Sequence, residues 1–170
     1  MTMISGVALL VSLAACVTDL RSRRIPNVLT FGSAIAALVF HLAAGGASGL
    51  LQAALGWFVG AAVFFIPFAL GGMGGGDIKL LAALGAWLGP IPALWLAVYT
   101  GMAGAVMAIV VAMAHGYLGQ ALKNIGLLLT HWRVMGIGPV EEISLAGSKG
   151  PKLAYALPIL SGTVLTIWLH

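Results

Sequence analysis

Apolar segments separated by short polar stretches run along almost the whole chain. Six of these segments predict helices, at residues 3–18, 28–44, 50–70, 78–88, 92–115 and 155–169. A helix needs roughly 17 to 25 residues to cross a bilayer, so segment 78–88 is short, and Gly89-Pro90 then interrupts it. The pattern predicts an all-α protein with about six transmembrane helices, in which 78–88 lies partly in the interface or forms a tight hairpin with the next helix.

A further segment is amphipathic. Between residues 116 and 130 the apolar side chains recur at helical spacing among polar ones: Leu118, Leu122, Ile125, Leu128 and Leu129. This spacing predicts a helix that lies in the membrane interface. Residues 43–49 predict a short connection, and residues 131–152, which contain Gly, Pro and Glu141-Glu142, predict a polar loop.

The composition supports a membrane protein. The chain is 61% hydrophobic and 7% charged, with a mean hydropathy of +1.10, whereas soluble domains carry roughly a quarter charged residues. The stretches between the apolar segments are too short for a second domain, because an independent core needs about 50 residues. We therefore expect one membrane domain over residues 1–170.

The positive charges predict the orientation. When six helices alternate, all eight Lys and Arg residues fall on one side of the membrane: Arg21, Arg23, Arg24, Lys79, Lys123, Arg133, Lys149 and Lys152. The positive-inside rule then places both termini outside, and the basic connections with the amphipathic helix in the cytoplasm. A net charge of +4 would suggest nucleic acid for a soluble protein. Here we expect anionic membrane lipid as the partner, and no nucleic acid.

Two acids carry the candidate chemistry. The chain has only four acidic residues, and Asp19 and Asp77 each adjoin an apolar segment, the second directly after Gly74-Gly75-Gly76. An acid at a membrane boundary is costly and usually functional. In an aspartyl protease one carboxylate activates water as a base, and its protonated partner polarises the scissile carbonyl. Glycines beside one acid permit unusual dihedral angles and the close approach of an extended substrate.

Each acid also has a structural interpretation. Asp77 could be the N-cap of the helix that follows it, and Asp19 could pair with a neighbouring arginine. A proton- or cation-coupled transporter would use Asp19 and Asp77 in another way, but it predicts acids near the bilayer midplane in repeated halves. The sequence has no such repeat. A non-catalytic assembly subunit would give no reason for paired acids.

The residues around both acids resemble one known family. Asp19 with the downstream Ile25-Pro26-Asn27, together with Gly74-Gly75-Gly76-Asp77, is similar to the type IV prepilin peptidases, whose second catalytic acid lies in a Gly-x-Gly-Asp motif. The resemblance covers nearly the whole chain. The late segment around Tyr155 also resembles the family's last motif, although Ala154 stands where the family usually has proline. The number of helices and Ile25-Pro26-Asn27 favour this branch over the related proteases that cut within membrane helices.

The resemblance implies a reaction and a place. Asp19 and Asp77 would remove the short basic leader of type IV prepilins at the cytoplasmic face of the bacterial inner membrane. Longer members of the family also N-methylate the product through a segment with a zinc-binding cysteine tetrad. Cys16 is the only cysteine here, so we expect a compact peptidase without the methyltransferase, similar to those of Flp (tight-adherence) pili. We expect no cofactor and no metal, because the four histidines lack ligand spacing.

Further residues are candidates for shaping the site. These are Gly74, Gly75, Gly76, Lys79, Pro26 and Asn27. Three roles are open to Lys79: lowering the pKa of an acid, orienting substrate, or extending to lipid headgroups. The acid pair should share a proton, so one pKa should rise well above about 4. Two glycine pairs at four-residue spacing, Gly56 with Gly60 and Gly85 with Gly89, predict close helix packing within the chain.

Overall fold

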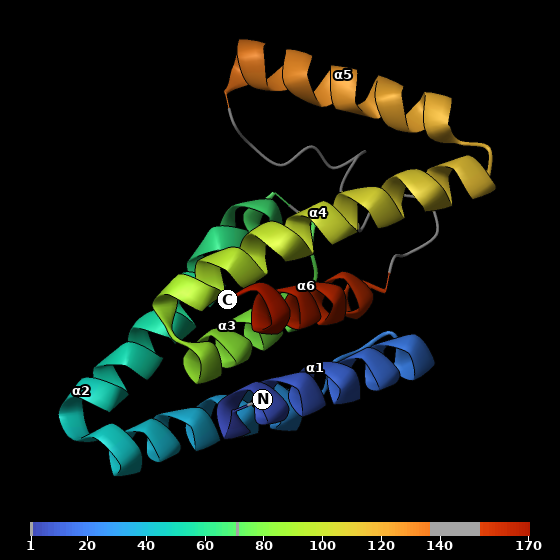
Figure 1. Cartoon of the computed structure of the whole chain (residues 1–170). Coiled ribbons are helices and arrows are strands. Elements are labelled where there is room, and N and C mark those ends of the chain that lie inside the picture. The colour runs from blue at the N-terminus through green and yellow to red at the C-terminus, as the bar shows by residue number, and fades with distance from the viewer. Residues whose placement is uncertain (1, 71, 137–153) are drawn as a thin grey trace.

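The computed structural model describes residues 2–70, 72–136 and 154–170, and within these ranges the chain forms helices and no strands. The helices are α1 (Met3–Ser22), α2 (Asn27–Ala69), α3 (Gly75–Leu88), α4 (Pro90–Ala114), α5 (Leu118–Met135) and α6 (Ala156–Leu169). All but α5 lie together in one bundle, whereas α5 turns back from the end of α4 and lies apart from the other helices (Figure 1). The predicted all-α fold is confirmed.

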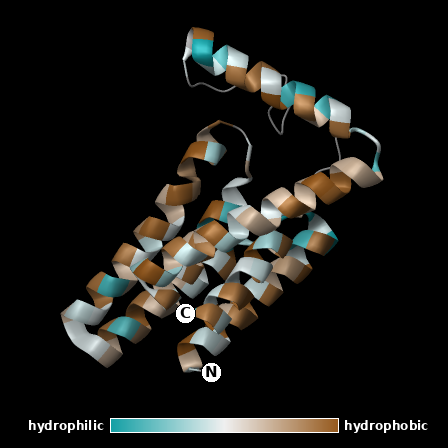
Figure 2. Ribbon diagram, turned by 45° about the horizontal axis from the view of Figure 1, so that its top comes forward, coloured by the Kyte–Doolittle hydropathy of each residue, from teal (hydrophilic) through white to brown (hydrophobic). Residues whose placement is uncertain are grey.

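The helices carry the signature of a membrane protein. By length and composition α1, α2 and α4 are able to cross a membrane, and α6 is a shorter apolar helix. Large apolar side chains point outward, with Phe58 63% and Ile66 64% exposed, while the interior is rich in alanine. Figure 2 shows apolar residues along the outside of the bundle. This arrangement suits lipid, because helices in a bilayer pack through small residues. The chain is an integral membrane protein.

Helix α2 contains two of the predicted segments, and the connection expected at residues 43–49 is wrong. Only Gly46 leaves the helical conformation, with φ 61° and ψ −147°. A glycine adopts these angles without a steric penalty, so one residue reverses the chain where a longer loop was predicted. The turn is tight, since a side chain at Gly49 would meet the carbonyl oxygen of His41. The two arms of α2 diverge from this bend (Figure 1).

Helix α3 lies between the two arms of α2. Toward the first arm, Trp87 Nε1 donates to Ser33 Oγ at 3.0 Å. Toward the second arm, Gly56 and Gly85 touch so closely that a β-carbon on either would meet the other's carbonyl oxygen. Gly60 lies in the same way against Leu81. The predicted packing of these glycines within the chain is confirmed, and α3 is short because protein rather than lipid surrounds it.

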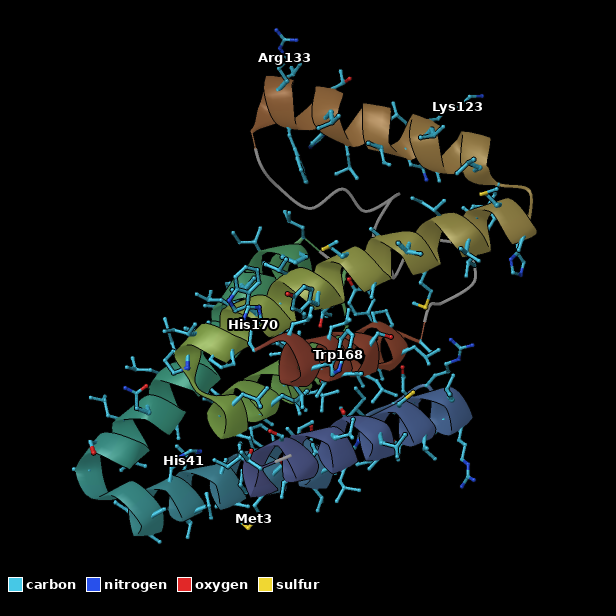
Figure 3. All side chains as sticks on the ribbon, in the orientation of Figure 1. Met3, His41, Lys123, Arg133, Trp168 and His170 are labelled. Atoms are coloured by element: carbon cyan, nitrogen blue, oxygen red, sulfur yellow. The ribbon has the colours of Figure 1, made fainter. Side chains whose placement is uncertain are left out.

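One other predicted boundary shifts. Helix α5 continues to Met135, so the prediction of a loop from residue 131 is wrong for residues 131–135; residues 137–153 lie outside the described part. The basic side chains Lys123 and Arg133 point away from the bundle (Figure 3). Exposed Leu122 and Ile125 form part of the apolar face predicted for this helix.

The segments run back and forth between two ends of the bundle. At one end, Thr2, His41, Leu88 and His170 line a cavity of about 720 Å³. The cavity therefore lies where the start of α1, the bend of α2, the junction of α3 with α4 and the end of α6 meet. The starts of α2 and α3 meet the end of α1 at the opposite end. Both candidate acids lie at that second end.

Candidate active site

Asp19 is held at the last turn of α1, where it is only 8% exposed. The helix ends just beyond it, because Arg23 adopts a left-handed conformation and its backbone N–H donates to the Asp19 carbonyl oxygen at 2.8 Å. A carboxylate at a helix C-terminus opposes the helix dipole. Here the first N–H of α6, from Ala156, donates to Asp19 Oδ2 at 3.4 Å. The start of α6 therefore stabilises a negative charge on Asp19.

Asp77 is in the first turn of α3, ahead of its apolar part. The interpretation of Asp77 as the N-cap is wrong, because the cap is Gly74 and α3 begins at Gly75. Burial, and after it the negative charge of Asp19, raise the pKa of Asp77 to about 7, although a backbone hydrogen bond with Gly74 lowers it. Desolvation and a neighbouring carboxylate both favour the protonated acid. Asp77 can therefore hold a proton close to neutral pH, in part because the negative charge of Asp19 disfavours its ionisation.

The two acids line one cavity of about 470 Å³. Its lining includes every predicted site residue except Lys79: Asp19, Pro26, Asn27, Gly74, Gly75, Gly76 and Asp77. Three further residues complete it, Arg23, Arg24 and Ile25. The sequence analysis gave the arginines roles in orientation, in lipid contact and in pairing with Asp19, and did not place them in the wall of the site. Their place on the wall follows from the sharp turn at Arg23, which no local pattern predicts.

The glycines beside Asp77 provide space rather than unusual dihedral angles. Gly74 has an ordinary φ of −78°, but a β-carbon on it would lie 2.9 Å from Asp77 Oδ2. A β-carbon on Gly76 would lie 3.3 Å from the β-carbon of Ile25. Two carboxyl groups and a substrate strand need this room. The expected close approach fits these positions, whereas the expected special backbone conformation is not used at Gly74.

Lys79 lies beside the cavity rather than in its wall. Its Nζ donates to Asn27 Oδ1 at 3.0 Å and lies 5.3 Å from the centre of the Phe31 ring. Pro26 is the N-cap of α2 and Asn27 its first residue. Proline suits this position because its ring fixes φ near the observed value of −62°. Lys79 thus reaches the site through Asn27.

Tyr155 is a neighbour of the site that the motif analysis did not single out for a role. It is the N-cap residue of α6. Burial, and then the negative charge of Asp77, raise the pKa of its hydroxyl. The hydroxyl fits against Gly104 of α4, where a β-carbon would come within 2.6 Å of it. The only signal in the sequence was its place in the late family-like segment, directly before an apolar run.

The potential metal ligands are dispersed in the part of the chain that the structure describes. No group of three or more His, Cys, Asp or Glu side chains gathers there. His41 and His170 line the cavity at the other end of the bundle, and Figure 3 shows both away from α5. Two acids of unlike environment in one cavity suit general acid–base attack of water on an amide.

The fold and the site together define a helical membrane protein with paired aspartates in a glycine-lined cavity. The model of the type IV leader peptidase family matches residues 6–113, and this range holds both acids and the three glycines. The chain belongs to this family. It is 38% identical over 122 residues to a prepilin leader peptidase/N-methyltransferase of Neisseria gonorrhoeae. The match covers 65% of this chain and 42% of that relative. No solved structure matches.

Proposed function

We propose that the protein is an aspartic endopeptidase that removes the short basic leader from type IV prepilins. The observation that carries this proposal is the shared cavity, in which burial and the charge of Asp19 raise the pKa of Asp77 to about 7. Membership of the type IV leader peptidase family supports the choice of substrate. The name of the gonococcal relative points in the same direction.

The two acids take different roles in the proposed reaction. Asp19 accepts the Ala156 N–H at the start of α6 at 3.4 Å. It removes a proton from water as the oxygen attacks the scissile carbonyl, and Asp77 gives its proton to the carbonyl oxygen. When the tetrahedral intermediate collapses, Asp19 passes its proton to the leaving nitrogen and the hydroxyl returns one to Asp77. Both acids recover their starting state.

The proposal includes one activity only. The family's methylating members carry a zinc-binding cysteine tetrad, and these 170 residues hold one cysteine, Cys16. Since a four-thiolate zinc site needs four cysteines, we assign leader removal without N-methylation. Among prepilins, the compact Flp-type substrates are the proposed class, in line with the resemblance to peptidases of tight-adherence pili.

The proposed location is the bacterial inner membrane, with the cavity at the cytoplasmic face. Arg23 and Arg24 line the cavity, and the positive-inside rule places such clusters in the cytoplasm. Anionic headgroups would surround the same arginines. A prepilin inserted in this membrane presents its leader on that side, so substrate and acids would meet at one boundary.

The proposed function is tested with purified protein in proteoliposomes and an Flp-type prepilin. Mass spectrometry of the product should show a single cut just before the hydrophobic helix of the pilin. With the methyl donor S-adenosylmethionine added, removal of the leader without a gain of one methyl group would support the peptidase-only assignment. Intact substrate after incubation of folded protein with several prepilins would overturn the proposal.

A further inference from the structure

A polar contact beside the cavity joins α3 to the start of α2. Lys79 Nζ donates to Asn27 Oδ1 at 3.0 Å and lies 5.3 Å from the centre of the Phe31 ring. Asn27 and Phe31 are one helical turn apart, so they face the same side of α2. One half-buried ammonium group therefore contacts both residues.

This contact fixes the orientation of the Asn27 amide. A lysine ammonium group has donors and no acceptor, so it can bind only the oxygen of the amide. The Nδ2 group must then face away from Lys79. No other described residue accepts a hydrogen bond from it, and Asn27 is exposed and lines the cavity that holds both acids. Two N–H donors are thus available at the wall of the site.

We propose that Asn27 donates from Nδ2 to a main-chain carbonyl oxygen of the bound substrate, and that Lys79 is the positioning residue that holds the amide for this contact. The inference rests on the proposed peptidase function and names how its substrate is held. An extended peptide beside the acids offers carbonyl oxygens along its length, and main-chain hydrogen bonds bind such segments whatever their side chains are.

The surroundings of Lys79 argue against a direct action on the acids. The groups that shift the pKa of Asp77, besides its burial, are Asp19 and Gly74. Lys79 is occupied by Asn27 and by the face of Phe31, which is a favourable place for a cation. Of the three roles open to this lysine, orienting substrate fits best, and it acts through Asn27.

The test separates the acceptor of the amide from its donors. Asn27→Asp keeps an oxygen for Lys79 but cannot donate, whereas Asn27→Ala removes both. Steady-state cleavage of a prepilin is measured for each variant at its own pH optimum. We expect KM for Asn27→Asp to rise roughly three- to tenfold, the loss of one hydrogen bond, with kcat nearly unchanged. Lys79→Met should raise KM similarly, and Lys79→Arg should remain within about twofold of the wild type.

Lys123→Met, which removes an exposed charge from α5, is the matched control and should leave KM unchanged. A wild-type KM for Asn27→Asp, in a wild-type protein that cleaves, would overturn this inference and leave the proposed function standing. A raised KM for Asn27→Asp with a normal one for Lys79→Met would overturn the positioning role. Failure of the wild type to cleave would overturn the proposed function, and this inference with it.

Discussion

At the scale of single residues, Asp77 combines two environments that rarely occur together. It sits at a helix N-terminus, which favours an ionised carboxylate, yet burial and the charge of Asp19 raise its pKa to about 7. The balance matters because a pKa near neutrality leaves a large fraction of the acid protonated, and so able to donate, close to pH 7. The other acid, Asp19, accepts a hydrogen bond from the Ala156 N–H at the start of α6.

A pH profile tests this division of roles. The proposed reaction needs a protonated Asp77, so kcat/KM should fall as the pH rises through about 7. The measurement is kcat/KM for leader cleavage between about pH 5 and about pH 9, in buffers of constant ionic strength. An unchanged rate over this whole range would contradict the role of Asp77 as the acid.

The same shift predicts an effect on stability. The folded pKa of Asp77, about 7, lies above the unfolded value of about 4. The folded state therefore binds the proton more tightly in this window, and stability is lost as the pH rises from about 4 to about 7. The amide side chain of the Asp77→Asn variant does not titrate. The melting temperature of this variant, relative to that of the wild type, should therefore be higher at about pH 8 than at about pH 5. If the difference in melting temperature between variant and wild type is the same at both pH values, the raised pKa of Asp77 is contradicted.

Gly74 gives a further prediction at the residue scale. Gly74→Ala would place a β-carbon 2.9 Å from Asp77 Oδ2, whereas at Gly75 it would make an ordinary contact with Phe68 at 3.5 Å. A displaced carboxyl group should lower kcat about tenfold or more. Gly75→Ala, the matched control, should stay within about threefold of the wild type. The measurement is kcat for leader cleavage, and equal effects of the two substitutions would contradict the steric role of Gly74.

The sequence predicts single residues only where a local pattern marks them. Asp19, Asp77 and the three glycines stand out as rare acids and small residues beside apolar segments. The contact of Lys79 with Asn27 joins residues 52 positions apart, and that of Ala156 with Asp19 spans 137 positions. Such contacts depend on how the helices pack, and the periodicity of one segment contains no information about its neighbours.

At the scale of elements, the central position of α3 explains its length. The helix has 14 residues and is buried between the arms of α2, so it need not match the thickness of the bilayer. The sequence predicted that this segment is short for a membrane span and that its glycines allow close helix packing. The single-residue turn at Gly46 was not predictable, because several neighbouring small residues could equally have formed a longer loop.

The glycine contacts predict a difference between two substitutions in α2. Gly56→Ala would drive a β-carbon against Gly85, while Gly32 has open space around it. We expect Gly56→Ala to destabilise the protein by about 1–3 kcal/mol, and Gly32→Ala to change stability by less than about 1 kcal/mol. Thermal unfolding in detergent measures both. Equal stability of the two variants would contradict the close packing of α2 on α3.

At the scale of the whole molecule, the two ends of the bundle differ in chemistry. One end holds the acids and Arg23 and Arg24, and the other holds both termini and the bend of α2. This alternation is what six apolar segments require; the sequence analysis assumed it to assign the loops and took the orientation from the positive charges. The predicted orientation adds that the acid end faces the cytoplasm.

Single cysteines test this orientation in whole cells. On a Cys16→Ala background, Ser48→Cys labels the bend of α2 and Ser22→Cys the end of α1; both serines are exposed. A membrane-impermeant thiol reagent added outside the inner membrane should label Ser48→Cys directly, and Ser22→Cys only after the membrane is opened. The reverse pattern would contradict a cytoplasmic cavity.

The most direct test of the central claim is to neutralise each of the four acids in turn and measure prepilin cleavage. Size-exclusion chromatography first confirms that Asp19→Asn and Asp77→Asn are folded. Both variants should then show no cleavage at all. Glu141→Gln and Glu142→Gln should retain it, since these acids have no part in the proposed chemistry. Cleavage by either aspartate variant at a rate near that of the wild type would contradict the catalytic pair.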